Sequence, residues 1–165
     1  MVIAIALCVV GLSQATQSSA PVATAVAAVT HMYHDFAAEA VIESEEVSIQ
    51  DLFGRPKATL ARYLDDALVT LVLADRACSR RTQEVCNLDF SPIWDSQDPI
   101  GTTAKISAGK DRTRVLVELR MPDRKATHRL TYRMMMTAAG WRVHDIEYDS
   151  HESLVTMLQR KPAFH

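Results

Sequence analysis

Residues Cys78 to Asp98 read Cys-Ser-Arg-Arg-Thr-Gln-Glu-Val-Cys-Asn-Leu-Asp-Phe-Ser-Pro-Ile-Trp-Asp-Ser-Gln-Asp. Before this stretch, apolar side chains recur at spacings of three and four residues, which indicates helices. After it, apolar and polar side chains mostly alternate, which indicates strands. The stretch therefore marks the change from helices to a sheet, and it is the most motif-like segment of the chain.

The first residues have the layout of a secretory signal peptide. Val2 to Leu12 form an apolar run that is too short to span a membrane, and Ser13-Gln14-Ala15 places small residues at a cleavage site. The usual positive charge is missing, since the first formally charged residue is Asp35. We expect a signal peptide of residues 1–15, with cleavage as late as residue 20. A buried N-terminal helix is the alternative.

Export would decide which cysteines the mature protein keeps and whether they can form a disulfide. Cleavage would remove Cys8, and because Leu7 rather than a small residue precedes it, Cys8 is not expected to carry a lipid. Cys78 and Cys86 would remain in an oxidising compartment, where a disulfide between them is the natural interpretation. Closing so short a loop stabilises a fold by roughly 2 to 3 kcal/mol in the chain-entropy model. Two free thiols in a cytosolic protein are the alternative.

Length and composition favour one globular domain. The 165 residues are 48% hydrophobic, which suits a single domain over residues 21–160 and a short tail over 161–165. Residues 1–100 contain 13 acidic and 6 basic residues and the remainder 7 and 12, so the helical half is acidic and the strand half is basic. The basic residues alternate with apolar ones instead of clustering with aromatic side chains, so we expect no nucleic-acid partner.

Two amphipathic helices are expected before the motif-like stretch. The first begins near Pro21 and carries apolar residues at helical spacing as far as Ala40. The second begins at Pro56 and runs to about Cys78, with a leucine stripe that should cover a sheet. The stripe is interpreted as core rather than as a cofactor site.

The loop that follows is the candidate binding site, and Pro92 and Pro99 exclude regular helix from it. Its aspartates are a candidate calcium site, but they lack the regular spacing of a calcium loop. Asp and Ser beside Pro more often cap their own backbone in tight turns, while a Trp anchors such a loop against the core. The predicted binding residues are Asp89, Trp94, Asp95, Gln97 and Asp98.

A second candidate metal site lies on the first helix, where His31 and His34 share a face beside Asp35. Local spacing places no third ligand near them, so exposed helix histidines are the favoured interpretation. We therefore predict no metal ion and no cofactor.

Four strands should form an antiparallel meander after the loop. The last strand contains an odd interval between Val143 and Ile146, which would turn its apolar side chains to opposite faces. A β-bulge at His144 and Asp145 would return both pairs to the core. Ser150 is then expected to cap a short last helix. The strands are predicted over residues 103–108, 114–121, 126–136 and 141–148.

This order of elements predicts an α+β domain, with N-terminal helices packed on a curved four-stranded antiparallel sheet and a short C-terminal helix. It is similar to the cystatin-like cone folds of nuclear transport factor 2, ketosteroid isomerase and scytalone dehydratase. Three segments also resemble a bacterial family of exported proteins, domain of unknown function 3828: residues 63–68, 88–98 and 141–148. The loop is the most specific of them, although Ser91 stands where the family pattern Asp-x-Asp-Pro has its second Asp. The resemblance covers most of the mature chain and implies fold and export, but no activity.

The sequence favours a non-catalytic binding protein of the cell envelope, either periplasmic or secreted. In this interpretation the loop and the open end of the cone contact an envelope protein or a small ligand, for example a peptidoglycan-related molecule. A role as an antitoxin or immunity protein is one form of it. No membrane span is expected after cleavage of the signal peptide.

The alternative is a small-molecule enzyme with acid/base residues inside the cone. His128 and Tyr132 are predicted on the inward face of the third strand, and Asp145 at the bulge could reach the same space. If these side chains converge on a pocket, the enzyme is favoured; if large side chains fill the cone, binding is favoured. No Ser-His-Asp order, Gly-rich phosphate loop or Cys-x-x-Cys is present.

Overall fold

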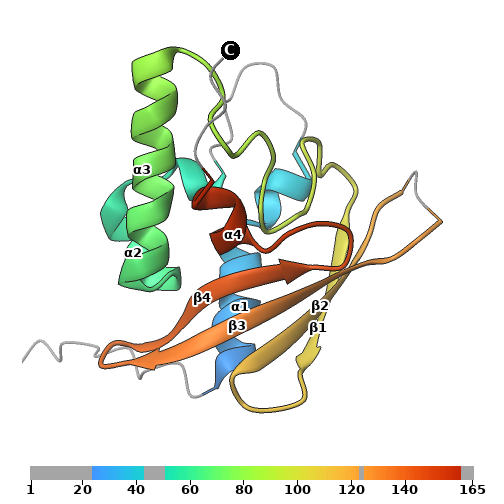
Figure 1. The fold of residues 1–165 in the computed structure, drawn as a ribbon. Helices are drawn as coiled ribbons and strands as arrows, with labels where there is room; N and C mark the ends of the chain where they lie inside the picture. Colours follow the sequence, from blue (N-terminus) through green and yellow to red (C-terminus); the bar gives the residue numbers. More distant parts are fainter. Residues whose placement is uncertain (1–23, 43–50, 123–124, 161–165) are drawn as a thin grey trace, which may run out of the picture.

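Four antiparallel strands form one curved, open sheet in which each strand pairs with its neighbour in the sequence (Figure 1). The structure is a computed structural model that describes residues 24–42, 51–122 and 125–160. The strands are β1 (Thr103–Ala108), β2 (Arg114–Arg120), β3 (His128–Thr137) and β4 (Gly140–Tyr148). The predicted antiparallel meander is therefore confirmed.

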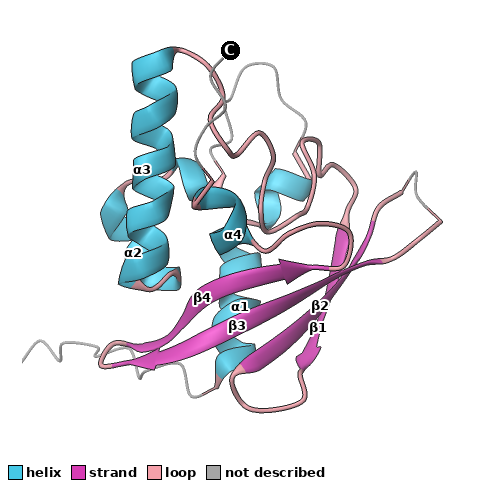
Figure 2. Cartoon of the chain, in the orientation of Figure 1, coloured by secondary structure: helices cyan, strands magenta, loops and turns pink. Residues whose placement is uncertain are grey.

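The helices cover one face of the sheet and the edge formed by β4, as Figure 2 shows. One helix, α1 (Ala25–Asp35), lies across the sheet and contacts β1, β2 and β4. The others contact β4 and one another: α2 (Lys57–Tyr63), α3 (Asp66–Thr82) and α4 (Leu154–Leu158). Two short 3₁₀ turns, η1 (Ala37–Ala40) and η2 (Leu52–Gly54), follow α1 and precede α2. The expected α+β class with a short C-terminal helix is confirmed.

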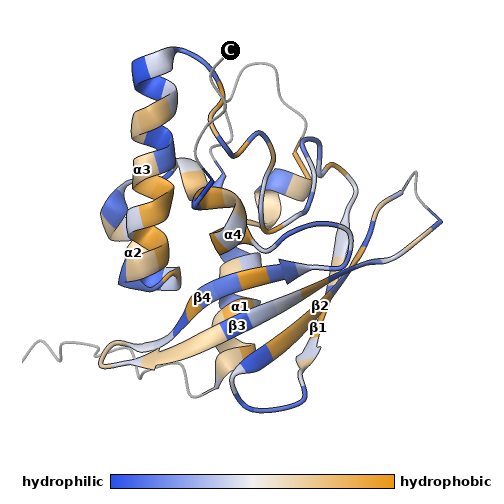
Figure 3. Ribbon diagram, viewed as in Figure 1, coloured by the Kyte–Doolittle hydropathy of each residue, from blue (hydrophilic) through white to orange (hydrophobic). Residues whose placement is uncertain are grey.

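Large side chains fill the space between the helices and the sheet. The part of α3 that faces the other elements is apolar, and its far end is hydrophilic (Figure 3). Burying these apolar surfaces is the main stabilising term of the fold. The core includes Met32, Tyr33, Leu68, Trp94, Val117, Tyr132 and Ile146, each less than 6% exposed.

The single helix predicted from Pro56 to Cys78 is wrong, because the structure divides it into α2 and α3. Leu64 leaves the helix in an extended conformation and bridges to Val143, and the Asp65 N–H donates to the Val143 carbonyl at 2.9 Å. The Asp65 carboxylate then accepts the Leu68 N–H at 2.8 Å and caps α3. The apolar spacing is helical on both sides of this break, so the periodicity alone does not reveal it.

The β-bulge predicted at His144 and Asp145 is confirmed. Arg133 pairs with Asp145 and Met134 with Val143, so His144 is the extra residue. The imidazole of His144 bonds to the capping residue of α3, Asp65, at 2.6 Å. The bulge therefore returns the apolar side chains of β4 to the core and also holds the N-terminus of α3.

The cap of the last helix differs from the prediction. Ser153 rather than Ser150 caps α4, accepting the Thr156 N–H at 3.4 Å. Asp145 supports the same end of α4, because its carboxylate accepts the Val155 N–H at 2.9 Å. A short helix whose first N–H groups are satisfied from the sheet can begin three residues later than its sequence suggests.

The predicted signal segment with Cys8, the start of the first helix at Pro21 and the tail over 161–165 lie outside the described residues. Within the ranges that are described, none of the helices is sufficiently long and apolar to cross a bilayer.

Candidate functional site

The motif-like stretch forms a loop over residues 87–99, which we call the 87–99 loop, and a disulfide precedes it. Cys78 and Cys86 are joined with an S–S distance of 2.00 Å and a Cα–Cα distance of 6.1 Å, so the predicted pairing is confirmed. Between them, α3 ends at Thr82, and its C-cap residue Gln83 has the left-handed φ of 60°. Asp75 on α3 then accepts the Asn87 N–H at 2.8 Å. Both bonds fix where the loop leaves the helix.

The centre of the loop is held from inside by buried aromatic residues. The Tyr33 hydroxyl donates to the Ile93 carbonyl at 2.5 Å, and the Tyr148 hydroxyl donates to the Pro92 carbonyl at 3.0 Å. Since Tyr33 uses its proton on Ile93, the Tyr132 hydroxyl donates to Tyr33 across 3.0 Å. Burial raises the pKa of all three tyrosines, so they remain neutral donors.

Asp95 holds the same loop through two histidines. Its carboxylate accepts Nδ1 of His128 at 2.8 Å and Nε2 of His151 at 2.7 Å. The Asp95 side chain is only 6% exposed, and its backbone has the left-handed φ of 49°. His151 also stacks on Tyr148, with ring centroids 4.3 Å apart. This arrangement ties the loop to the start of β3 and to the segment after β4.

Glu39 is a buried carboxylate on the opposite side of the loop. Its two oxygens accept the Ser91 hydroxyl at 2.9 Å and the Leu52 N–H at 3.2 Å. Burial, with a smaller contribution from the nearby Asp51 carboxylate, raises the pKa of Glu39 to about 7, although the Ser91, Leu52 and Trp94 donors each lower it. Among the described residues, Glu39 therefore has neutral hydrogen-bond donors where Asp95 has imidazoles.

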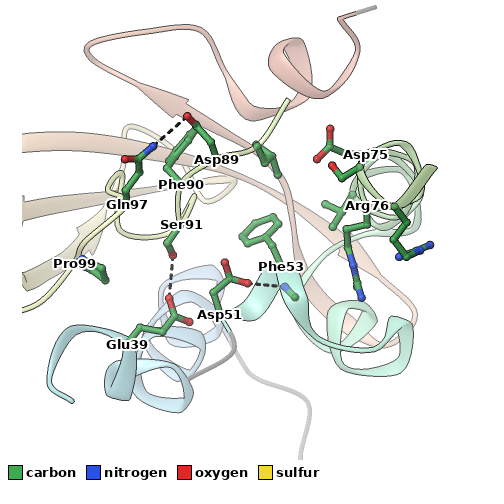
Figure 4. A pocket seen from close by; sticks show the side chains of 15 residues that line it. Glu39, Asp51, Phe53, Asp75, Arg76, Asp89, Phe90, Ser91, Gln97 and Pro99 are labelled. Atoms are coloured by element: carbon green, nitrogen blue, oxygen red, sulfur yellow. Dashed lines mark hydrogen bonds between the residues drawn. The ribbon is translucent and has the colours of Figure 1, made fainter. Parts of the chain in front are cut away.

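A cleft of about 530 Å³ opens beside Glu39, and we call it the Glu39 cleft (Figure 4). Residues of η1, η2, α3 and the 87–99 loop line it, and they mix carboxylates, hydroxyls, two guanidinium groups and aromatic rings. A concave site with several polar groups beside apolar side chains is typical of a ligand site. The lining includes Glu39, Asp51, Phe53, Asp75, Arg76 and Ser91.

A second cleft of about 820 Å³, the His151 cleft, lies on the other side of the loop. It is bounded by the loop, the end of β2 and α4, and its lining includes Asp95, Asp98, Thr102, Met121, His151 and Arg160. Asp89, Phe90 and Gln97 line both clefts, so they form a ridge between them. Gln97 donates to Asp89 at 3.1 Å along this ridge.

The structure separates the five predicted binding residues into two groups. Asp89, Gln97 and Asp98 are exposed at the clefts, and Asp98 accepts the Ile100 N–H at 3.3 Å. Trp94 is 4% exposed and packs edge-on against a core tyrosine, as the predicted anchor should. Asp95 is buried between its two histidines. The first group can contact a partner, and the second positions the loop.

The three residues of the enzyme alternative do not meet at one cavity. His128 bonds to Asp95, whereas the fully buried Tyr132 bonds to Tyr33 in the core. Asp145 accepts the N–H groups of Ile146 and Val155, each at 2.9 Å. These contacts give the three side chains separate structural roles.

The side chains of both candidate metal sites, the loop aspartates and the α1 histidines, bond to other protein groups. His31 and His34 both lie beside Asp35, at 3.2 and 3.4 Å, with exposed imidazoles. The described ranges contain no group of three or more His, Cys, Asp or Glu side chains placed to hold a metal ion.

The sequence patterns did not predict Glu39, Ser91 or His151 as members of the site. Glu39 could have been found, because it is a single carboxylate within the apolar run Ala37 to Val41. Ser91 and His151 gave no such signal, since isolated polar residues in loops are common.

Comparison with protein-family models, curated proteins and solved structures found no match. The resemblance described in the sequence analysis therefore stays a prediction.

Proposed function

We propose that this protein is exported to the cell envelope and acts there as a non-catalytic binding protein. Its recognition surface would consist of the ridge residues Asp89, Phe90 and Gln97 with the clefts on either side. The proposal extends to membership of the exported family that the loop resembles. The partner would be an envelope protein or a peptidoglycan-related molecule, and with a secreted toxin as partner the role would be antitoxin-like.

One observation supports binding best: the two large clefts of the described residues both adjoin the same loop, while aromatic side chains fill the interior. Tyr33, Trp94 and Tyr132 are each at most 5% exposed there. A recognition surface built from exposed side chains on a rigid support loses little conformational entropy when a partner binds. The disulfide at the start of the loop supports an oxidising compartment.

The experiment expresses the full chain with a C-terminal affinity tag, follows it by fractionation, and cross-links it before purification and mass spectrometry. We expect it in the envelope fraction with one stoichiometric partner that is cross-linked close to the ridge. The double variant Asp89→Ala/Gln97→Ala should lose this partner. Both residues are exposed, so the variant should remain folded.

The matched control is Arg129→Ala, a truncation on β3 at a side chain that is 72% exposed and ion-paired with Glu118. It should keep the partner at the wild-type level. Equal loss in both variants, or a partner cross-linked to β3 instead of the loop, would contradict the proposed surface.

A further inference from the structure

Glu39 connects three separate segments at the floor of the Glu39 cleft. It lies in η1, its Oε1 accepts the Leu52 N–H of η2, and its Oε2 accepts the Ser91 hydroxyl of the 87–99 loop. The dashed line between Glu39 and Ser91 in Figure 4 marks the second of these contacts. A change at this one carboxylate therefore acts on the loop and on η2 together.

The surroundings of Glu39 make its charged form unfavourable. The residue is 7% exposed, and none of the ion pairs among the described residues involves it. An ionised carboxylate in such a place has little contact with solvent and no paired cation to balance it. Its neutral form keeps both contacts, because one oxygen still accepts from Leu52 while the other donates to Ser91.

Each element packed around Glu39 contributes a group that bears on this equilibrium. Asp51 faces it from η2 and raises its pKa, and Tyr33 and Tyr132 face it from α1 and β3 as neutral hydroxyls. The indole of Trp94 faces it from the loop: its Nε1 makes no hydrogen bond of ordinary geometry among the described residues, but as a nearby donor it lowers the pKa of Glu39.

The remaining charged residues line the same cleft at its walls: Asp75, Arg76, Arg80 and Asp89. Arg76 is already engaged, because it donates to the Arg55 carbonyl at 2.7 Å. Asp75 and Asp89 also have donors, from Asn87 and Gln97. Neither Arg76 nor Arg80 forms an ion pair with Glu39, and no cation contributes to its pKa shift.

We propose that Glu39 is a proton-operated latch of the recognition surface: with its proton, Glu39 holds the loop against η1 and η2, and without it the cleft opens. This inference rests on the proposed binding function and adds its regulation. Opening would give a partner more access to the Glu39 carboxylate at the floor of the cleft, so partner capture should increase as the pH rises through the transition.

The raised pKa of Glu39 sets the pH range over which the free energy of unfolding changes and the direction of that change. Glu39 titrates at about 7 in the folded protein against an ordinary value of 4.5, so the folded state binds more protons between these values. Its stabilising contribution is complete below the ordinary value and is lost as the pH rises to the folded value. Over this window the unfolding equilibrium constant should rise by about 10²-fold through Glu39 alone.

The test compares wild type with Glu39→Gln, whose amide can accept from Leu52 and donate to Ser91 without a charge. Hydrogen exchange of loop peptides is measured at pH 5.5 and 8.5 and corrected for the intrinsic exchange rate. Wild-type protection in the 87–99 loop should fall by about tenfold or more at the higher pH. Protection in Glu39→Gln should stay constant. An equal fall in both proteins would overturn the latch.

A carbon-13 NMR titration of the Glu39 carboxyl tests the latch in the wild type, even if the variant does not fold. The expected midpoint is about 7, and a midpoint below 5.5 would overturn the proposal. Neither measurement uses a partner, so the latch can fail while the binding function holds. If capture fails while both pH measurements succeed, the binding function alone is contradicted.

Discussion

Within the 87–99 loop, the segment over residues 92–95 is held by side chains from α1, β3 and the end of β4, whereas the exposed residues bond only within the loop and its following turn. Tyr33, His128 and Tyr148 supply three of the outside contacts. Asp89 and Gln97 bond to each other. The loop therefore has an inner side that fixes its shape and an outer side that is available to a partner.

The two buried carboxylates beside the loop sharpen this comparison. Asp95 has histidines on both oxygens at 2.7 and 2.8 Å, and Glu39 has a hydroxyl and an amide. Glu39 has only neutral donors and no cation to balance its charge, so its burial favours the protonated form. Burial alone would not have distinguished the two.

The largest effect is expected for Asp95→Ala. The change removes the acceptor of two histidines and places Ala at a left-handed φ of 49°, which Asp tolerates better. Breaking a buried charged contact typically costs about 3 to 5 kcal/mol, and we expect a loss of about 3 kcal/mol in the free energy of unfolding. Urea denaturation at pH 6.5 measures it.

Asp95→Asn is the matched control, because Asn also accepts the left-handed conformation and keeps one acceptor oxygen. Its loss should be about half that of Asp95→Ala. If Asp95→Ala loses less than about 1 kcal/mol, the histidine contacts do not hold the loop, and Asp95 would have to be counted with the exposed residues.

The next effect concerns the disulfide, which constrains the chain directly before the first residue of the loop. The double variant Cys78→Ser/Cys86→Ser should lose about 2 to 3 kcal/mol, mainly because the unfolded chain gains freedom. Thermal unfolding followed by circular dichroism measures the change. The wild type in a strong reductant should unfold at the same temperature as the double variant, and a stable reduced protein would contradict the prediction.

The sequence predicted the sheet well because its evidence was local. Alternating side chains placed the strands, and the odd interval between Val143 and Ile146 revealed the bulge. The division between α2 and α3 escaped prediction, since it depends on Leu64 pairing with a strand about eighty residues later. A contact between distant segments leaves little trace in helical periodicity.

The candidate site was predictable to a smaller extent. Proline and aspartate in one stretch identified the loop, because these residues favour turns, and the tryptophan among them identified the anchor Trp94. The roles of Asp95 and Glu39 depend on His151 and Ser91, which approach them from distant parts of the chain. Spacing cannot show which of several aspartates folding will bury.

The smallest effect on stability is expected for Asp89→Ala, and for that reason it tests the outer side of the loop best. Asp89 is exposed and bonds to Gln97, another exposed side chain, so removing the carboxylate should change the free energy of unfolding by less than about 0.5 kcal/mol. Urea denaturation should therefore superimpose on the wild type, while partner capture should fall. A loss above about 1 kcal/mol would show instead that Asp89 supports the fold, and the division between an inner and an outer side would have to be redrawn.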